Sequence, residues 1–287
     1  MTKSITAKIS EKILKATKPE YMTSQEKIKE FIKNKEEKTD KKIKTIFKTK
    51  YFKNTPIITF GNKNKTKHTI LYIHGGAYIN ELNLQHQLYC YMLSKKLNAY
   101  VIAPAYPLTP KHTYNETYSL ITDLYEKLIK DNDIILMGDS AGGGFAIGFC
   151  QYLNTKGIKQ PKNLITFSPW VDISMSGDYK KYENTDPVLG KMGLKEIGQK
   201  WAGTLDTQNY KVSPYFGDTS NLPKTLIFTG TNEIFYPDIE KFYKKLKKEK
   251  VDVRLITEED LFHVYPLYPI AEAKKALKEI KKEIKID

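Results

Sequence analysis

Three side chains in this sequence have the types and settings that nucleophilic catalysis requires, and the first is Ser140. It lies in Gly138-Asp139-Ser140-Ala141-Gly142, a G-x-S-x-G pattern between the apolar run 133–137 and helically spaced apolar residues over 145–153. A strand, a sharp turn and a helix in this order are typical of a nucleophile elbow, which lifts the serine hydroxyl above a sheet. Such a turn forces the serine into a sparsely populated backbone conformation, and it needs the small neighbours that are present here.

A serine nucleophile also needs a base to take its proton and an acid to orient that base. His263 lies in a loop after the last expected strand, and Glu233 lies just past the end of another. The chain order of nucleophile, acid and base is one that a large group of serine hydrolases shares. Asp238 is the alternative acid, but it follows Pro237 where a helix begins, and a carboxylate there has an ordinary role beside the first amide groups. We therefore favour Glu233.

The third requirement is a set of donors for the oxyanion that forms during acyl transfer. The backbone N–H of Ala141 is one candidate, and those of Gly75 and Gly76 are the others, because glycine lets a loop approach the substrate oxygen closely. His74 directly precedes the glycine pair at a strand end, and we expect it to hold the shape of this loop. We assign no role to the histidines outside these motifs, which are His68, His86 and His112.

The elements that must position these residues alternate between strand and helix, which implies a mostly parallel sheet with helices on both faces. An antiparallel pair is expected first, over 43–49 and 56–60. The segment 171–210 breaks the rhythm and contains a short helix at 193–201, as a lid above the strand ends would. The other expected strands are 69–73, 100–103, 133–137, 163–167, 224–229 and 251–256, and the other helices are 84–97, 114–130, 145–153, 237–248 and 268–282.

The first 40 residues predict two helices ahead of the main domain. A helix over 3–16 places three isoleucines on one face among lysines, and a capping pattern at 23–26 opens the second helix. A basic amphipathic helix could lie on an anionic membrane surface. We favour the simpler arrangement, in which Ile5, Ile9 and Ile13 pack on the body of the protein. We expect residues 1–40 to form part of a cap, and 41–287 to form the main domain with a cap insertion at about 171–210.

Composition disfavours several other classes of function. Lys and Arg number 47 against 33 Asp and Glu, giving a net charge of +14, but Arg254 is the only arginine. A nucleic-acid site would be expected to use arginine forks, so we expect no nucleic-acid partner. Cys90 and Cys150 lie within apolar segments that are expected to be helical, and their spacing matches no metal-binding or redox motif. We find no signal-peptide pattern and no apolar run of membrane-spanning length, and therefore expect a cytoplasmic protein without stable membrane insertion.

The two glycine motifs together resemble those of the hormone-sensitive-lipase family of α/β-hydrolases. The residues concerned are His74-Gly75-Gly76-Ala77-Tyr78 and 138–143, and the similarity extends through Ser168-Pro169-Trp170-Val171-Asp172, from about Tyr51 onward. The resemblance implies an α/β-hydrolase fold, with a mostly parallel sheet of about eight strands, helices on both faces and a helical cap. It also implies a carboxylic ester hydrolase that forms an acyl-serine intermediate and uses no cofactor or metal. The family usually has aspartate where this chain has Glu233.

We therefore expect a serine hydrolase for small, short-chain acyl or aryl esters, with Ser140, His263 and Glu233 as its triad. An amidase or arylformamidase on the same triad is the alternative, since the leaving group cannot be read from sequence. A peripheral membrane lipase that uses the basic first helix is another rival. A non-catalytic ligand-binding protein on the same scaffold is disfavoured because no triad member is missing. The expected partner is a small-molecule ester; the oligomeric state is left open, with a homodimer as one option.

Overall fold

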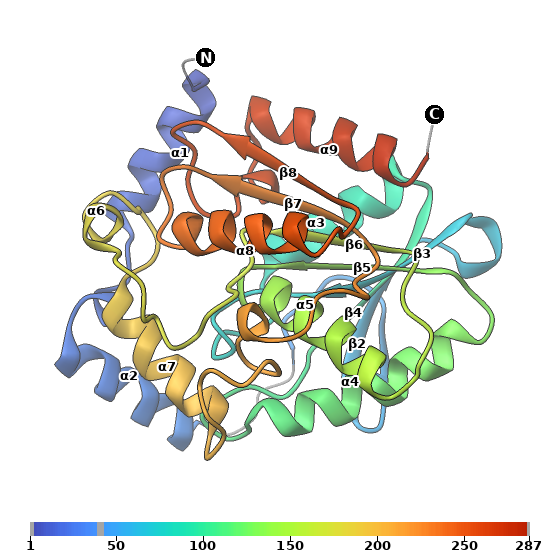
Figure 1. The fold of residues 1–287 in the computed structure, drawn as a ribbon, viewed down its shortest axis with the longest axis horizontal. Helices are drawn as coiled ribbons and strands as arrows, with labels where there is room; N and C mark the ends of the chain where they lie inside the picture. The colour runs from blue at the N-terminus through green and yellow to red at the C-terminus, as the bar shows by residue number, and fades with distance from the viewer. Residues whose placement is uncertain (1–2, 39–42, 286–287) are drawn as a thin grey trace.

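The computed structural model describes residues 3–38 and 43–285. Its centre is an eight-stranded sheet in the order β1-β2-β4-β3-β5-β6-β7-β8 (Figure 1). β2 pairs antiparallel with β1 and β4, and all neighbours from β4 to β8 pair parallel. The α/β class and the mostly parallel sheet are therefore confirmed. The strands are β1 (Thr49–Phe52), β2 (Thr55–Phe60), β3 (His68–Ile73), β4 (Ala99–Pro104), β5 (Ile134–Asp139), β6 (Asn163–Phe167), β7 (Lys224–Gly230) and β8 (Val253–Glu258).

Helices cover both faces of the sheet (Figure 1). α4, α5 and α8 pack into one core, and α1, α3 and α9 pack into the core on the opposite face. The helices are α1 (Ile5–Ala16), α2 (Gln25–Glu37), α3 (Leu84–Lys96), α4 (Tyr114–Ile129), α5 (Ser140–Thr155), α6 (Lys180–Glu183), α7 (Lys191–Ala202), α8 (Tyr236–Lys248) and α9 (Ala271–Glu283).

The central strands β3, β4 and β5 are largely apolar because both of their faces are buried. In β3, Leu71 and Ile73 belong to the core under α4 and α5, while Ile70 and Tyr72 belong to the core under α3 and α9. Successive side chains of a strand point to opposite faces, so a strand between two helical layers needs apolar residues at every position. The same alternation runs through β5, which ends at the elbow that positions Ser140.

The two N-terminal helices lie in different places. α2 packs on α7 and on η1 (Glu20–Met22), a short 3₁₀ turn between α1 and α2. η1 packs on α7 as well, and Gly190 and Gly193 allow that contact, because a Cβ on either glycine would lie within 3 Å of the Met22 backbone. α1 instead packs on α9, at another edge of the molecule (Figure 1). The expected domain boundary at residue 40 lies outside the described residues.

The expectation that the isoleucines of α1 pack on the body is wrong. Ile5, Ile9 and Ile13 are 76%, 56% and 58% exposed. The buried residues of α1 are Ala7 and Glu11, on the opposite side of the helix. The small side chain of Ala7 lets α1 approach the core under α9 closely, and Glu11 is paired with lysines. Periodicity identified an apolar face correctly, but a different face meets the protein.

Two segments differ from the expected elements. The first strand begins at Thr49, because the backbone N–H of Phe47 bonds the Thr45 hydroxyl in a turn and the Phe47 ring packs against that of Phe60. The alternation from residue 43 therefore does not extend the strand. Within 171–210 the structure contains the short helix α6 ahead of α7, and the sequence pattern predicted only the second of these.

Candidate active site

Ser140 occupies a strained turn between β5 and α5. Its φ is +53°, in the left-handed region that side chains rarely adopt. A Cβ at Gly138 would lie 2.5 Å from the carbonyl oxygen of Gly142, and one at Gly142 would lie 2.1 Å from that of Ile73. Both contacts are closer than real Cβ atoms allow, so only glycine fits the two positions. The elbow geometry expected from the sequence is therefore present.

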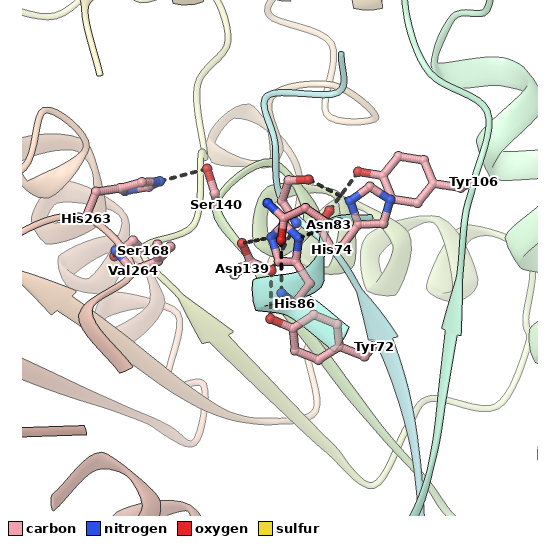
Figure 2. A network of polar contacts seen from close by, with 11 residues as sticks. Tyr72, His74, Asn83, His86, Tyr106, Asp139, Ser140, Ser168, His263 and Val264 are labelled. Carbon is pink, nitrogen blue, oxygen red and sulfur yellow. Dashed lines mark hydrogen bonds and ion pairs between the residues drawn. The ribbon is translucent and has the colours of Figure 1, made fainter. Parts of the chain in front are cut away.

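His263 and Glu233 complete a chain of hydrogen bonds that begins at Ser140. The Ser140 hydroxyl lies 2.9 Å from Nε2 of His263, whose ring points toward it in Figure 2. Nδ1 of His263 lies 2.7 Å from Oε2 of Glu233. All three residues are buried: Ser140 is 6% exposed, His263 3% and Glu233 0%. The structure thus brings together the three residues that the sequence singled out.

The two candidate acids have different surroundings. Glu233 follows β7, and the hydroxyl of Thr229 donates to its Oε1, so both carboxylate oxygens have partners. Asp238 lies in the first turn of α8, where it accepts a 2.5 Å hydrogen bond from the Tyr179 hydroxyl. Burial raises the pKa of Asp238 to about 6. Asp238 also forms an ion pair with Lys241 of the same helix. Through Tyr179, it belongs to the contact between α8 and the 171–210 segment.

The environment of His263 favours its protonated form. Burial alone lowers the pKa of the imidazole, but the hydrogen bond and negative charge of Glu233 outweigh this, with a further contribution from Asp186. The pKa of His263 is therefore raised above the ordinary value of 6.5. A base held in this way is oriented toward the serine and stabilised once it accepts a proton.

The loop after β3 departs from the expected donor set. The N–H of Gly75 donates to Oδ1 of Asp139 at 2.9 Å, so it is already occupied and we withdraw it as an oxyanion donor. The same carboxylate accepts hydrogen bonds from the Tyr72 hydroxyl at 2.7 Å and from Nε2 of His86 at 3.3 Å (Figure 2). Asp139, the variable residue of the elbow motif, therefore anchors the loop. His86, to which no sequence motif gives a role, helps to hold Asp139.

Donors remain in the next residues of this loop. Within the described part of the chain, the N–H groups of Gly76 and Ala77 donate to no acceptor. Both residues have left-handed backbones, with φ of +108° and +52°. Ala141 lies in the first turn of α5, where N–H groups have no partner within the helix. Ala77 is a candidate donor that sequence reasoning missed. The available signal was the carboxylate of Asp139 in the elbow motif, which takes the N–H of Gly75.

The histidine of this loop is neutral and structural. Burial, together with the neighbouring His86, lowers the pKa of His74 to about 3. Its Nδ1 lies 2.6 Å from the carbonyl oxygen of Gly75, and its ring stacks on Tyr106 at 4.3 Å between centroids. The Tyr106 hydroxyl donates in turn to the carbonyl oxygen of His74. These contacts fit the expected role of His74 in holding the loop.

Known proteins are similar to this chain in sequence and in fold. A sequence model for the α/β-hydrolase fold matches residues 70–267. The chain belongs to the α/β-hydrolase family. An esterase from Acinetobacter venetianus is 31% identical to this hydrolase over 220 residues, which span 74% of this chain and 72% of the relative. An acetyl-hydrolase from Streptomyces hygroscopicus is 26% identical over 205 residues, with 70% and 69% covered.

The similarity extends to solved structures. A hormone-sensitive lipase from a metagenome library superposes on this hydrolase with a TM-score of 0.82 at 24% identity, covering 98% of this chain and 97% of the other. The family match and the esterase relative, together with this shared fold, confirm the resemblance to hormone-sensitive-lipase esterases. The protein is a serine hydrolase that acts on carboxylic esters. No helix in the described residues is long and apolar enough to cross a membrane.

A buried carboxylate of the 171–210 segment reaches the acid loop of this hydrolase. Oδ2 of Asp186 accepts the N–H of Ile234, the residue after Glu233, at 2.8 Å. Its Oδ1 accepts the N–H groups of Val188 and Leu189 at 2.7 and 2.9 Å. Burial raises the pKa of Asp186 above its ordinary value. Asp186 thus ties the loop that bears Glu233 to the segment above the sheet, and no sequence motif pointed to it.

Aromatic rings form a continuous row beside the site. The Phe235 ring meets the His263 ring edge-on at 5.2 Å and stacks on Trp170 at 5.6 Å. Tyr78, just after the glycine loop, lies 5.8 Å from Trp170 and stacks on Trp201 of α7 at 4.1 Å. The row therefore connects the base, the glycine loop and the 171–210 segment, and it gives the site a rigid apolar wall.

The two cysteines lie apart from the triad. Cys90 and Cys150 are free and buried. Burial raises the pKa of both thiols, and the charge of Asp139 adds to the effect at Cys90. Both therefore behave as small apolar side chains. Among the residues that the structure describes, no group of three or more His, Cys, Asp or Glu side chains could hold a metal ion.

Proposed function

We propose that this hydrolase cleaves small carboxylic esters through a triad of Ser140, His263 and Glu233 and an acyl-serine intermediate. The observation that supports it best is the unbroken pair of contacts, 2.9 Å from serine to imidazole and 2.7 Å from imidazole to glutamate. Catalytic hydrogen bonds of this kind need donor and acceptor within about 2.6–3.2 Å. The nucleophile, base and acid already meet that requirement.

The first half of the reaction transfers the acyl group to the enzyme. Ser140 attacks the ester carbonyl while Nε2 of His263 takes the hydroxyl proton, and Glu233 stabilises the imidazolium. The carbonyl oxygen becomes an oxyanion, which accepts hydrogen bonds from the N–H groups of Gly76, Ala77 and Ala141. When the intermediate collapses, the C–O bond to the alcohol breaks, and His263 returns the proton to the departing oxygen.

The second half releases the acid. Water enters, His263 removes a proton from it, and the resulting oxygen attacks the acyl-serine carbonyl. The same N–H groups bind the second oxyanion. Collapse then breaks the bond to Ser140 Oγ, which recovers its proton from His263. The products are one carboxylic acid and one alcohol, and the enzyme returns to its starting state.

The cap of this enzyme consists of η1, α2 and the 171–210 segment. Support comes from the packing of α2 and η1 on α7, and from the amide of Asn80, which donates to the Tyr21 hydroxyl at 3.3 Å. Asn80 belongs to the turn that follows the glycine loop, since its N–H bonds the carbonyl oxygen of Gly76. A cover in this place excludes water from the reacting atoms. α1 lies apart from this cap, so the cap is smaller than the whole of residues 1–40.

The aromatic wall favours a short acyl group. The backbone N–H of Trp170 donates to the carbonyl oxygen of Ser140 at 2.9 Å, and its ring reaches the catalytic histidine through Phe235. Trp170, Tyr78 and Trp201 are nearly or fully buried. Large buried rings in the wall beside the base favour a small acyl chain, because a longer one would have to displace them at a cost in packing.

A substrate series tests this proposal. We expect kcat/KM to be highest for p-nitrophenyl acetate and butyrate and to fall by roughly tenfold or more for the octanoate. The matching p-nitroanilides test the leaving group, and we expect them to be cleaved much more slowly. A preference for octanoate would contradict the short acyl pocket. Anilides cleaved as fast as esters would favour the amidase alternative.

A further inference from the structure

The outer face of α1 carries a row of isoleucines that nothing in the described structure covers. Ile5, Ile9 and Ile13 are spaced by four residues, so they lie on one face, and each exposes more than half of its side chain. Isolated exposed apolar residues are normal on protein surfaces, but three in one helical row are a patch. The opposite face of α1 is occupied by its contact with α9.

The exposed charged side chains of α1 have one sign. Lys8 and Lys12 are exposed, and both lie on the outward half of the helix beside the isoleucines. The only carboxylate within α1 is that of Glu11, which is buried on the inner side, where it pairs with Lys15 and accepts a 3.2 Å hydrogen bond from Asn232. Within α1, the exposed charged side chains beside the row are therefore all lysines. α9, which packs beside α1, adds the exposed Lys274 and Lys278, together with Lys275, which pairs with Glu258 at 3.8 Å.

α1 is held firmly in place. The backbone N–H and the hydroxyl of Ser4 both donate to the carboxylate of Glu272, at 2.7 and 2.8 Å. Further along α1, the amide of Asn232 donates to the carboxylate of Glu11. Asn232 directly precedes Glu233 in the sequence, so α1 is also tied to the acid loop. The apolar row is thus presented by a helix that is already folded, so its docking would not require an ordering step.

We propose that α1 docks this hydrolase on an anionic lipid surface. Ile5, Ile9 and Ile13 enter the boundary between headgroups and acyl chains, and the flanking lysines contact the lipid phosphates. An amphipathic helix with a lysine-bearing polar side is the type of element that binds membranes in the plane of the interface. Each basic residue near such a surface contributes roughly fivefold to affinity. The docking is shallow and reversible, and it places an ester hydrolase beside a source of ester substrates.

A second copy of the chain fits this face less well. A twofold contact through α1 would set Lys8 and Lys12 of one copy against the same lysines of the other, without an exposed carboxylate on the helix to neutralise them. Three side chains also supply much less than the roughly 800 Å² per partner of a stable interface. An anionic surface satisfies both the apolar row and the charges.

Vesicle flotation tests the proposal on the full-length protein. Vesicles of equal parts phosphatidylglycerol and phosphatidylcholine should carry the protein to the top of the gradient, and pure phosphatidylcholine should carry far less. The variant with Ile5, Ile9 and Ile13 all changed to glutamine should lose at least about tenfold in binding. Lys8→Gln with Lys12→Gln should weaken binding to the anionic vesicles, and high salt should act in the same direction.

A second helix supplies the matched control. Leu84, Leu88 and Tyr91 form an exposed apolar row on α3, but lysines follow only at its end. Their change to glutamine should leave vesicle binding intact. Hydrolysis of p-nitrophenyl acetate by the α1 and α3 variants should be unchanged, which shows that both fold.

Three results would overturn the proposal. They are absence of anionic vesicle binding by the intact protein, equal loss in the α3 variant, and a dimer in solution that the isoleucine substitutions dissociate.

Discussion

The carboxylate of Glu233 and the imidazole of His263 form a direct 2.7 Å contact from Oε2 to Nδ1. The hydroxyl of Thr229, near the end of strand β7, donates to the other carboxylate oxygen. In the proposed triad, glutamate thus takes the place that aspartate usually has in the family that this chain resembles. Asp238 instead accepts a hydrogen bond from the Tyr179 hydroxyl at 2.5 Å.

Replacement of the two acids should separate these tasks. We expect Glu233→Gln to lower kcat by about 10³–10⁴-fold, because an amide neither orients the imidazole correctly nor stabilises its charge. Asp238→Asn should leave turnover nearly unchanged and alter the free energy of unfolding by on the order of 1 kcal/mol. Turnover and melting temperature of the two variants, measured side by side, check this. A collapse of turnover in the Asp238 variant alone would assign the acid to Asp238.

The pH dependence of kcat/KM should report the raised pKa of His263. The imidazole must be neutral to accept the proton of Ser140, so activity falls as pH drops through that pKa. Because Glu233 raises it, the acid limb should lie above 6.5. Glu233→Gln removes the main raising interaction and should move the limb to lower pH. An acid limb that stays in place in this variant would mean that another group titrates.

Asp139 should act as a positioning residue for the oxyanion loop. Asp139→Ala leaves the N–H of Gly75 and the hydroxyl of Tyr72 without their acceptor, so Gly76 and Ala77 lose their support. We expect kcat to fall by about 10²-fold with little change in KM, as when an oxyanion donor is lost. Asp139→Asn retains an acceptor oxygen and should recover most of the activity. Similar kinetics for the alanine variant and the wild type would refute this role.

Asp186 should couple the 171–210 segment to the base. Asp186→Asn can keep one oxygen for Val188 and Leu189 but turns an amide donor toward the N–H of Ile234. We expect a loss of roughly tenfold in kcat and a shift of the acid limb to lower pH, since a negative charge that raises the pKa of His263 is removed. Asp178→Asn, an exposed position in the same segment, is the control. An unmoved acid limb would leave Asp186 with a packing role only.

Sequence reasoning succeeded where function imposes a local backbone constraint. The turn at Ser140 accepts only glycine at two positions, and a short sequence motif is enough to reveal that requirement. It failed where a role depends on contacts between distant segments. Asp139 is the variable residue of its motif, and its bond to Gly75 appears only when β3 and β5 lie side by side. The face of α1 that packs on the protein was likewise decided by the shape of its neighbours, which favoured Ala7 over the isoleucines.

The turnover of Ser140→Ala tests the central claim most directly. The chain in which Ser140 attacks, His263 transfers the proton and Glu233 stabilises its charge requires this hydroxyl. We predict that hydrolysis of p-nitrophenyl acetate falls by about 10⁵–10⁶-fold, while the melting temperature and the circular dichroism spectrum stay those of the folded protein. A folded Ser140→Ala variant that keeps turnover near that of the wild type would contradict the account.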